Sequence, residues 1–244
     1  MKRFFALLLI LGSFVTESPA QTLALKKGVI MDSLPLQDSV SSRLKLYLPQ
    51  EFEGTRNWPL LFICHLDKDA LQTMRYLTSA AEANGYILAS SSVMPDSVSL
   101  TKRLLSINNS VEKLKELLPI DNSRIYAAGY DQGGQLAVLV PSLIPSVSGV
   151  LSVASILPNP ELISSKKRFD YVNIVGRADY QYVQVNEEEE LLDQRKIPNF
   201  TLFHPKGHEW PVMSALDLGM QVLTLMSMKQ NEMTRDSVKI RTSY

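Results

Sequence analysis

The sequence contains little that could form a metal centre or a covalent cross-link. One cysteine and three histidines occur among its 244 residues. A single cysteine excludes an internal disulfide, and so few cysteines and histidines do not supply the ligand spacings of a structural zinc site. We therefore expect neither a metal nor another cofactor. Cys64 lies in an apolar run and is expected to be an inert thiol of the core.

The sequence also lacks an excess of charge of either sign. Lysine and arginine together number 25, aspartate and glutamate also number 25, and the formal net charge is zero. This balance does not favour nucleic acid or an anionic membrane surface as a partner. Hydrophobic residues make up 45% and charged residues 20%, a composition typical of a globular domain, and the length suits one α/β domain.

No apolar run is long enough to span a membrane. The longest such run, Phe4 to Val15, follows Lys2 and Arg3 and precedes small residues that end at Ala20. A spanning helix needs about 20 apolar residues, whereas this three-part pattern is typical of a secretory signal peptide. We expect residues 1–20 to be removed and the mature protein to be exported, to a periplasm or to the outside, without a membrane span. An uncleaved anchor is the alternative.

Short apolar runs alternate with amphipathic segments along the rest of the chain. This alternation predicts βαβ units and a mostly parallel sheet with helices on both faces, over residues 21–230. The first two strands have no helix between them, which predicts an antiparallel start. A helix is predicted over 186–196, with an acidic run that we interpret as a solvated face near its N-terminus. Residues 231–244 form a polar tail. The predicted strands are 28–34, 42–49, 60–65, 86–91, 124–129, 147–155, 171–176 and 200–205.

One stretch, IYAAGYDQGGQLA from Ile125 to Ala137, has the pattern of a strand, a tight turn and a helix. Its turn reads G-x-D-x-G, with Asp131 between Gly129 and Gly133. Hydrolases that use this turn as a nucleophile elbow usually carry serine at the middle position. The structural alternative is that Asp131 only caps the helix that follows it.

Chemically active side chains follow four of the predicted strands. They are His65, Asp131, Asp179 and His208. Ligands of open parallel sheets bind beyond the carboxyl ends of the strands, so we expect His208 to lie within reach of Asp131 and Asp179. The order of elbow residue, acid and histidine is that of the α/β-hydrolase triad. A structural or surface role is the alternative for His65 and for His204.

Three stretches together resemble the α/β-hydrolase superfamily, especially small exported esterase-like members related to polyhydroxyalkanoate depolymerases and feruloyl esterases. YAAGYDQGG resembles their Y-x-x-G-x-S-x-G-G elbow, GRADYQY occupies the place of their acid loop, and GHEWP resembles their G-H-x-W-P histidine loop. The resemblance implies a fold without a cap domain. It implies that Asp131 stands at the nucleophile position, Asp179 at the acid and His208 at the base.

The same resemblance implies an oxyanion hole beside the elbow. The N–H of Gln132 would be one donor, and the other would come from the loop that begins near His65. The family commonly has a glycine-rich stretch in that loop. This chain has CHLDKDA there, which contains no glycine.

Two classes of function follow from an aspartate at the elbow. The first is an exported hydrolase of the carboxyl-ester class, with an atypical Asp–His–Asp site and a small-molecule or polymer ester as its ligand. The second is a catalytically inactive relative that binds a ligand or partner in the cleft. Asp131 has no hydroxyl for the serine mechanism, so we expect little turnover of simple aryl esters. Aspartate can attack an alkyl carbon, as in haloalkane dehalogenases and epoxide hydrolases of this fold, but Gln132 is not the tryptophan those enzymes use.

Overall fold

The structure is a computed structural model that describes residues 25–35, 43–66, 70–91, 97–159, 163 and 168–229. The expected signal peptide, residues 1–20, and the polar tail, residues 231–244, lie outside the described residues. Both therefore remain predictions. Part of the segment between the sixth and seventh strands also lies outside, so the expected lack of a cap domain remains a prediction too.

The described residues form one eight-stranded sheet in the order β1-β2-β4-β3-β5-β6-β7-β8. The pairs β1–β2 and β2–β4 are antiparallel, and every other neighbouring pair is parallel. This confirms the mostly parallel sheet with an antiparallel start. The strands are β1 (Ile30–Pro35), β2 (Arg43–Tyr47), β3 (Trp58–Ile63), β4 (Ile87–Ser91), β5 (Ile120–Tyr130), β6 (Val147–Val153), β7 (Asp170–Gly176) and β8 (Asn199–His204).

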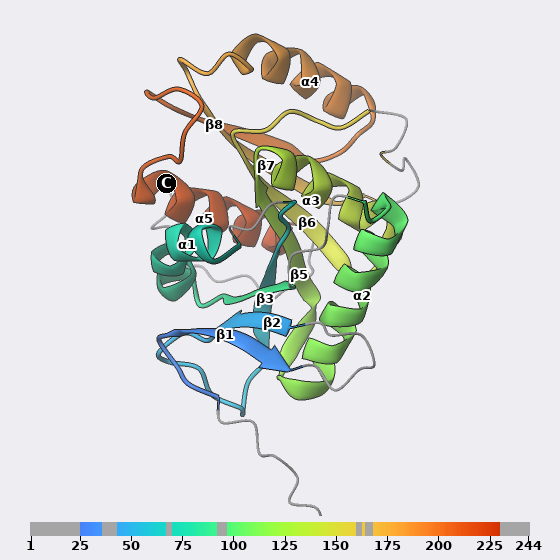
Figure 1. The fold of residues 1–244 in the computed structure, drawn as a ribbon. Helices are drawn as coiled ribbons and strands as arrows, with labels where there is room; N and C mark the ends of the chain where they lie inside the picture. The colour runs from blue at the N-terminus through green and yellow to red at the C-terminus, as the bar shows by residue number, and fades with distance from the viewer. Residues whose placement is uncertain are drawn as a thin grey trace, which may run out of the picture.

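Helices cover both faces of the sheet, as predicted (Figure 1). Side chains of α1 and α5 pack on one face together with Leu61, Val172 and Ile174, whereas α2, α3 and α4 pack on the other with Phe62 and Val150. Strands β3 and β7 are buried along their whole length, because a sheet covered on both faces has no solvent-facing side. The helices are α1 (Ala70–Asn84), α2 (Leu100–Leu117), α3 (Gln132–Leu143), α4 (Tyr182–Gln194) and α5 (Met213–Lys229).

Helix α4 corrects one detail of the sequence interpretation. It begins at Tyr182 rather than at residue 186, because the turn before it already forms helical hydrogen bonds from Val185 to Gln181. The acidic run therefore lies in the middle of the helix, not near its N-terminus. Glu188 is half-buried and accepts a 2.8 Å hydrogen bond from the N–H of Leu157. Burial raises the pKa of Glu188 to about 7.

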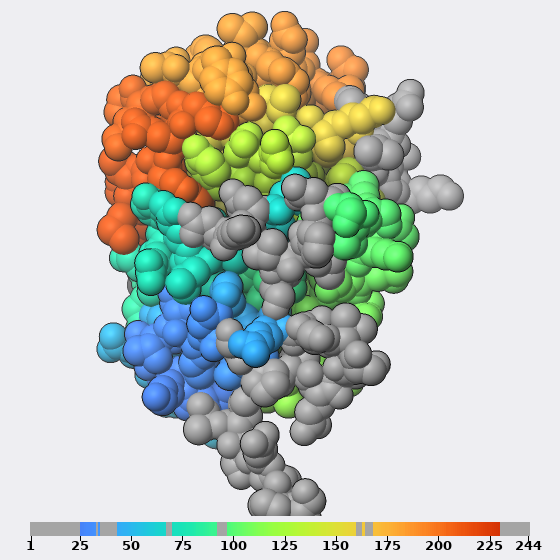
Figure 2. Space-filling model, in the orientation of Figure 1, coloured from blue at the N-terminus to red at the C-terminus, as the bar shows by residue number. Residues whose placement is uncertain are grey.

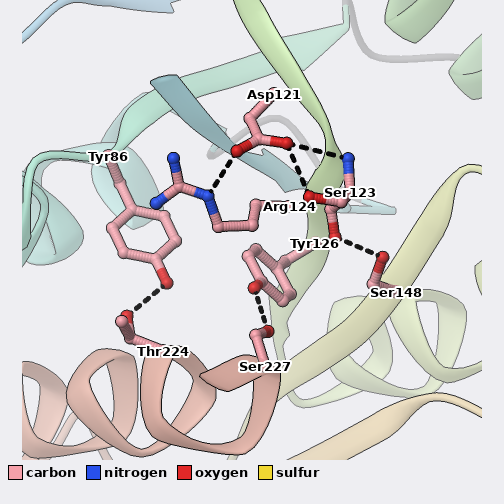
Figure 3. Close-up of polar contacts among 8 residues, drawn as sticks. All are labelled: Tyr86, Asp121, Ser123, Arg124, Tyr126, Ser148, Thr224 and Ser227. Atoms are coloured by element: carbon pink, nitrogen blue, oxygen red, sulfur yellow. Dashed lines mark hydrogen bonds and ion pairs between the residues drawn. The ribbon is translucent and has the colours of Figure 1, made fainter. Parts of the chain in front are cut away.

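A buried polar cluster joins α5 to the end of the sheet where the parallel strands begin (Figure 3). The hydroxyl of Tyr86 bonds to that of Thr224 at 2.7 Å, and the hydroxyl of Tyr126 bonds to that of Ser227. Each partner is buried. Both α5 hydroxyls named here bond to a tyrosine in or directly before a strand, so this contact between α5 and the sheet leaves neither hydroxyl unpaired.

None of the helices among the described residues is both long enough and apolar enough to cross a bilayer.

Candidate active site

The turn at Asp131 is a strained junction between β5 and α3. Asp131 has φ 48° and ψ −119°, a combination that L-residues rarely adopt, and its N–H donates to the carbonyl of Val153 at 2.9 Å. Such a conformation costs about 1–3 kcal/mol and persists only where the surrounding structure enforces it. The predicted tight strand-to-helix turn at Asp131 is thus confirmed.

Two glycines allow the elbow to pack this tightly. A Cβ at Gly129 would lie 2.1 Å from the carbonyl oxygen of Gly133, and a Cβ at Gly133 would lie 2.5 Å from the carbonyl oxygen of Cys64. Any side chain at either position would therefore collide with backbone. The G-x-D-x-G spacing is a steric requirement of this turn.

The side chain of Asp131 does not cap α3: it accepts no hydrogen bond from the first turn of that helix. The structural alternative for this residue is therefore wrong. Instead, its Oδ1 lies 3.7 Å from Nε2 of His208, and about a third of the side chain, 37%, is exposed. The carboxylate thus faces the histidine and the solvent.

His208 lies between two carboxylates. Its Nδ1 is 3.0 Å from Oδ2 of Asp179, whose side chain is fully buried and whose Oδ1 accepts a 2.9 Å bond from the N–H of Gln181. A carboxylate only accepts, so Nδ1 carries the donated hydrogen and Nε2 faces Asp131. The prediction that His208 reaches both aspartates is confirmed by this geometry.

Aromatic rings surround the histidine. Trp210 is stacked between Tyr130 and Tyr76, with ring centroids 4.8 Å and 4.6 Å away. Tyr180 lies 4.7 Å from the His208 ring, and Tyr130 donates a 3.2 Å hydrogen bond to the backbone carbonyl of His208. The stack links α1, the elbow and the histidine loop. Figure 2 shows α1 in teal beside the orange C-terminal segment, and α1 and α5 pack against each other.

A cleft of about 370 Å³ opens over the elbow, a size suited to a small molecule. Burial, and after it the negative charges of Asp131 and Asp179, raise the pKa of Tyr130. Burial raises the pKa of Cys64 to about 12, so its thiol stays neutral, in agreement with the expected core role. The described residues that line the cleft are Cys64, His65, Leu66, Gln72, Thr73, Tyr130, Asp131, Gln132, Gly133 and Trp210.

The two oxyanion-hole candidates, Gln132 and His65, both line this cleft. Nε2 of His65 lies 3.0 Å from the carbonyl of Ser91, which can only accept, so this nitrogen donates to the sheet rather than to the cleft. Residues 67–69 of the same loop lie outside the described residues. The oxyanion role of either residue stays a prediction.

His204, at the end of β8, is buried, and burial lowers the pKa of its ring. Its Nδ1 accepts a hydrogen bond from the N–H of Lys206, so it has a structural position where β8 leads into the histidine loop. Among the residues that the structure describes, no group of histidine, cysteine, aspartate and glutamate is arranged to hold a metal ion.

The sequence interpretation missed the aromatic residues of the site. Tyr130 directly precedes Asp131, Tyr180 directly follows Asp179, and Trp210 lies two residues after His208. An aromatic residue therefore lies within two positions of each of the three site residues, and this pattern was visible in the sequence. Tyr76 gave none, because it reaches the stack from the exposed side of α1.

No protein-family model matches the chain, and no curated protein matches it in sequence. Solved structures do resemble it. Esterase B from Lactobacillus rhamnosis is 19% identical, with a TM-score of 0.64, and the alignment covers 84% of this chain and 87% of that one. The hyperthermophilic esterase from Pyrobaculum calidifontis is 12% identical, with a TM-score of 0.64 and coverage of 82% and 87%.

A third similar structure is the fluorophosphonate-binding serine hydrolase F of Staphylococcus aureus. It is 12% identical, has a TM-score of 0.60, and is aligned over 82% of this chain and 99% of its own. Identities this low show the shared fold alone. Together with the parallel sheet, its antiparallel start and the elbow after β5, they show that the chain has the α/β-hydrolase fold.

Proposed function

We propose that the protein is an exported hydrolase in which Asp131 is the nucleophile, His208 activates water and Asp179 orients His208. Asp131 would attack a saturated carbon rather than an acyl carbon. A carboxyl ester is a less favoured substrate than a compound attacked at a saturated carbon, since attack by a carboxylate on an ester carbonyl would form an anhydride.

The single observation that carries the proposal is the direction of the Asp131 side chain. It leaves the N-terminus of α3 without capping it and faces Nε2 of His208 at 3.7 Å. Backbone strain of this kind clusters at functional sites, so the strain at Asp131 favours a functional role for its side chain.

The first step would form an ester on the enzyme. An Asp131 oxygen attacks the carbon, the bond from that carbon to its leaving group breaks, and the leaving group departs with the bonding electrons. Aspartate is ionised at neutral pH in ordinary surroundings and needs no base for this attack. Gln72, Thr73 and Gln132 line the cleft and carry donors that could receive an electronegative leaving group.

The second step would hydrolyse that ester. Nε2 of His208 takes a proton from water, and the hydroxide attacks the carboxyl carbon of Asp131. The alcohol product then leaves and the carboxylate is restored. Asp179 holds Nδ1 throughout and stabilises the charge that develops on the ring.

A second candidate is a cleft that binds a ligand without turnover. The observation that favours it is the 37% exposure of the Asp131 side chain. A hydrated carboxylate is a weak nucleophile until the ligand displaces its water, so a ligand that leaves this water in place would be bound and not converted.

The test is to trap the ester. We would incubate His208→Gln protein with a panel of short 1-haloalkanes and terminal epoxides and measure the mass of the peptide that contains residue 131. Because the second step needs His208, the alkyl adduct should accumulate on Asp131 in this variant and not in the wild type. Asp131→Asn in the same background is the control and should carry no adduct.

A single turnover of the wild type in ¹⁸O-labelled water supplies an independent readout. The first alcohol released should contain ordinary oxygen, because that atom comes from Asp131. Incorporation of the label at the first turnover, or no adduct across the panel, would contradict the nucleophile role. Export is tested separately: the mature protein recovered outside the cytoplasm should begin at Gln21.

A further inference from the structure

The charge of the cleft points to the kind of molecule that it takes. No lysine or arginine occurs among the described residues that line it, whereas Asp131 does. The nearby Lys206 is 3.7 Å from Glu209 and is partly neutralised by it. An anionic ligand would therefore meet a carboxylate that no lysine or arginine among the described lining residues offsets, which is unfavourable in a partly enclosed cleft.

The net charge of Asp131, Asp179 and His208 together is negative, whether the imidazole ring is neutral or protonated. Asp131 and Asp179 contribute two negative charges, and a protonated imidazole would offset one of them. Asp179 is buried and already bonded to the ring, so the charge left over resides on Asp131, which is exposed to the cleft. The raised pKa of Tyr130 has the charges of both aspartates among its causes.

Aromatic side chains line the cleft or lie beside His208. Tyr130 and Trp210 line the cleft, and Tyr180, whose ring lies 4.7 Å from His208, is 75% exposed. Exposed aromatic faces attract organic cations, and more strongly where water is excluded. Trp210 offers only its edge, because tyrosines cover both of its faces. Tyr180 is not among the described residues that line the cleft, but it lies against His208, which faces Asp131, and its side chain is largely exposed.

We propose that the cleft selects small organic cations, namely onium compounds such as sulfonium or quaternary ammonium ions, over neutral and anionic molecules of the same shape. Asp131 supplies the counter-charge and Tyr180 an aromatic face. This binding preference does not depend on turnover.

The reaction of such a substrate rests on the function proposed above. Asp131 attacks a carbon bonded to a sulfonium sulfur, the carbon–sulfur bond breaks, and its electron pair leaves with a neutral thioether. The enzyme-bound ester is then hydrolysed by water that His208 deprotonates, which gives an alcohol and a proton. A neutral leaving group needs no anion-stabilising donor, so a glutamine at position 132 is compatible with this reaction.

The binding test uses two molecules of nearly the same shape. Choline and 3,3-dimethylbutan-1-ol differ by a positively charged nitrogen in place of a carbon. By calorimetry or saturation-transfer NMR we expect the wild type to bind choline about tenfold or more tightly than the alcohol, which corresponds to roughly 1.4 kcal/mol or more. Asp131→Asn should bring the ratio close to one, and Tyr180→Leu should lower it less.

Equal affinity for the two molecules would overturn the proposal, and so would tighter binding of 3,3-dimethylbutanoate. A wild type that binds none of the three would overturn it as well. Asp131→Asn keeps the size of the side chain, so a loss of choline binding with unchanged stability reports on charge and not on folding.

A second arm separates this proposal from the proposed function. His208→Gln protein is incubated with benzyldimethylsulfonium and, in parallel, with benzyl chloride. A benzyl adduct on Asp131 from the sulfonium supports both proposals. An adduct from the chloride alone supports the nucleophile role and overturns the cationic substrate. No adduct from either, with the choline preference intact, overturns the nucleophile role and supports selection of cations.

Discussion

Polar side chains have opposite surroundings at the two ends of the sheet, buried and hydrogen-bonded at one and partly exposed at the other. Where the parallel strands begin, Tyr86 and Tyr126 are fully buried and each bonds to a hydroxyl of α5. Where the strands end, Asp131 sits in a strained turn with an exposed carboxylate 3.7 Å from His208. Paired and buried groups stabilise a fold, whereas strained and partly solvated groups remain available to a ligand. This difference is one reason why we propose the functional site at the second end.

The largest effect expected is on activity. Asp131→Ser places a hydroxyl beside His208, and we expect hydrolysis of p-nitrophenyl acetate to rise about a hundredfold or more over the wild type, since loss of the nucleophile costs a serine hydrolase roughly a factor of a million. Steady-state kinetics measure this rise, and Asp131→Ser combined with His208→Ala should abolish it. Robust wild-type turnover that disappears in His208→Ala would instead make Asp131 a working esterase residue.

The next effect is on stability at the elbow. Gly129→Ala brings a Cβ to 2.1 Å from the Gly133 carbonyl, and we expect it to lower the free energy of unfolding by about 3 kcal/mol or more, as overpacking against backbone does. Gly54→Ala is the matched control, because nothing lies within 4 Å of its Cβ. Equal urea midpoints for the two variants would show that the elbow is not as tightly packed as described.

A matched pair of hydroxyl deletions compares the two ends directly. Tyr126→Phe leaves the buried Ser227 hydroxyl without its bond and should cost about 1–3 kcal/mol of unfolding free energy. Tyr180→Phe, at a side chain that is 75% exposed beside the cleft, should change it by less than about 0.5 kcal/mol. Chemical denaturation measures both, and the reverse ranking would break the comparison.

Relief of the backbone strain at Asp131 should raise the free energy of unfolding, whereas the substitutions at Gly129 and Tyr126 lower it. Asp131→Gly removes the Cβ from a residue at φ 48° and should raise the free energy of unfolding by about 1 kcal/mol while choline binding is lost. Lys196→Gly, at φ 58° after the end of α4, is the control. It should stabilise by a similar amount and leave binding unchanged. A destabilised Asp131→Gly would mean that the carboxylate, rather than the backbone, stabilises the turn.

The last prediction concerns the pH dependence of stability at Glu188, a half-buried carboxyl with a pKa raised from 4.5 to about 7. The folded state then binds the proton more tightly than the unfolded state, so the contribution of Glu188 to stability is greatest below about pH 4.5 and falls as the pH rises toward 7. Glu188→Gln should remove this fall and keep an acceptor for the N–H of Leu157. Urea midpoints of the two proteins at pH 5 and pH 8 test it, and parallel pH curves would contradict the assignment.

Much of the site could be predicted because its parts are local. The glycines around Asp131 set the elbow, and a strand before each of Asp131, Asp179 and His208 places them at one edge of the sheet. The start of α4 was missed because the turn at Gln181 carries no capping signal in its side chain. Tyr76 was missed because its partner, Trp210, lies far along the chain.

The sequence by itself determined the alternation of strands and helices, the tight turn and the order of the three site residues, because these depend on periodicity and on steric limits within a few residues. Only the tertiary structure decided that Asp131 faces His208 instead of capping α3, that Asp179 is buried behind the ring, and that Tyr76 closes the aromatic stack. The physical reason is that the direction of a side chain depends on the packing of β5, β7, α1 and the histidine loop against one another. Those segments are distant in the chain and meet only in the folded protein.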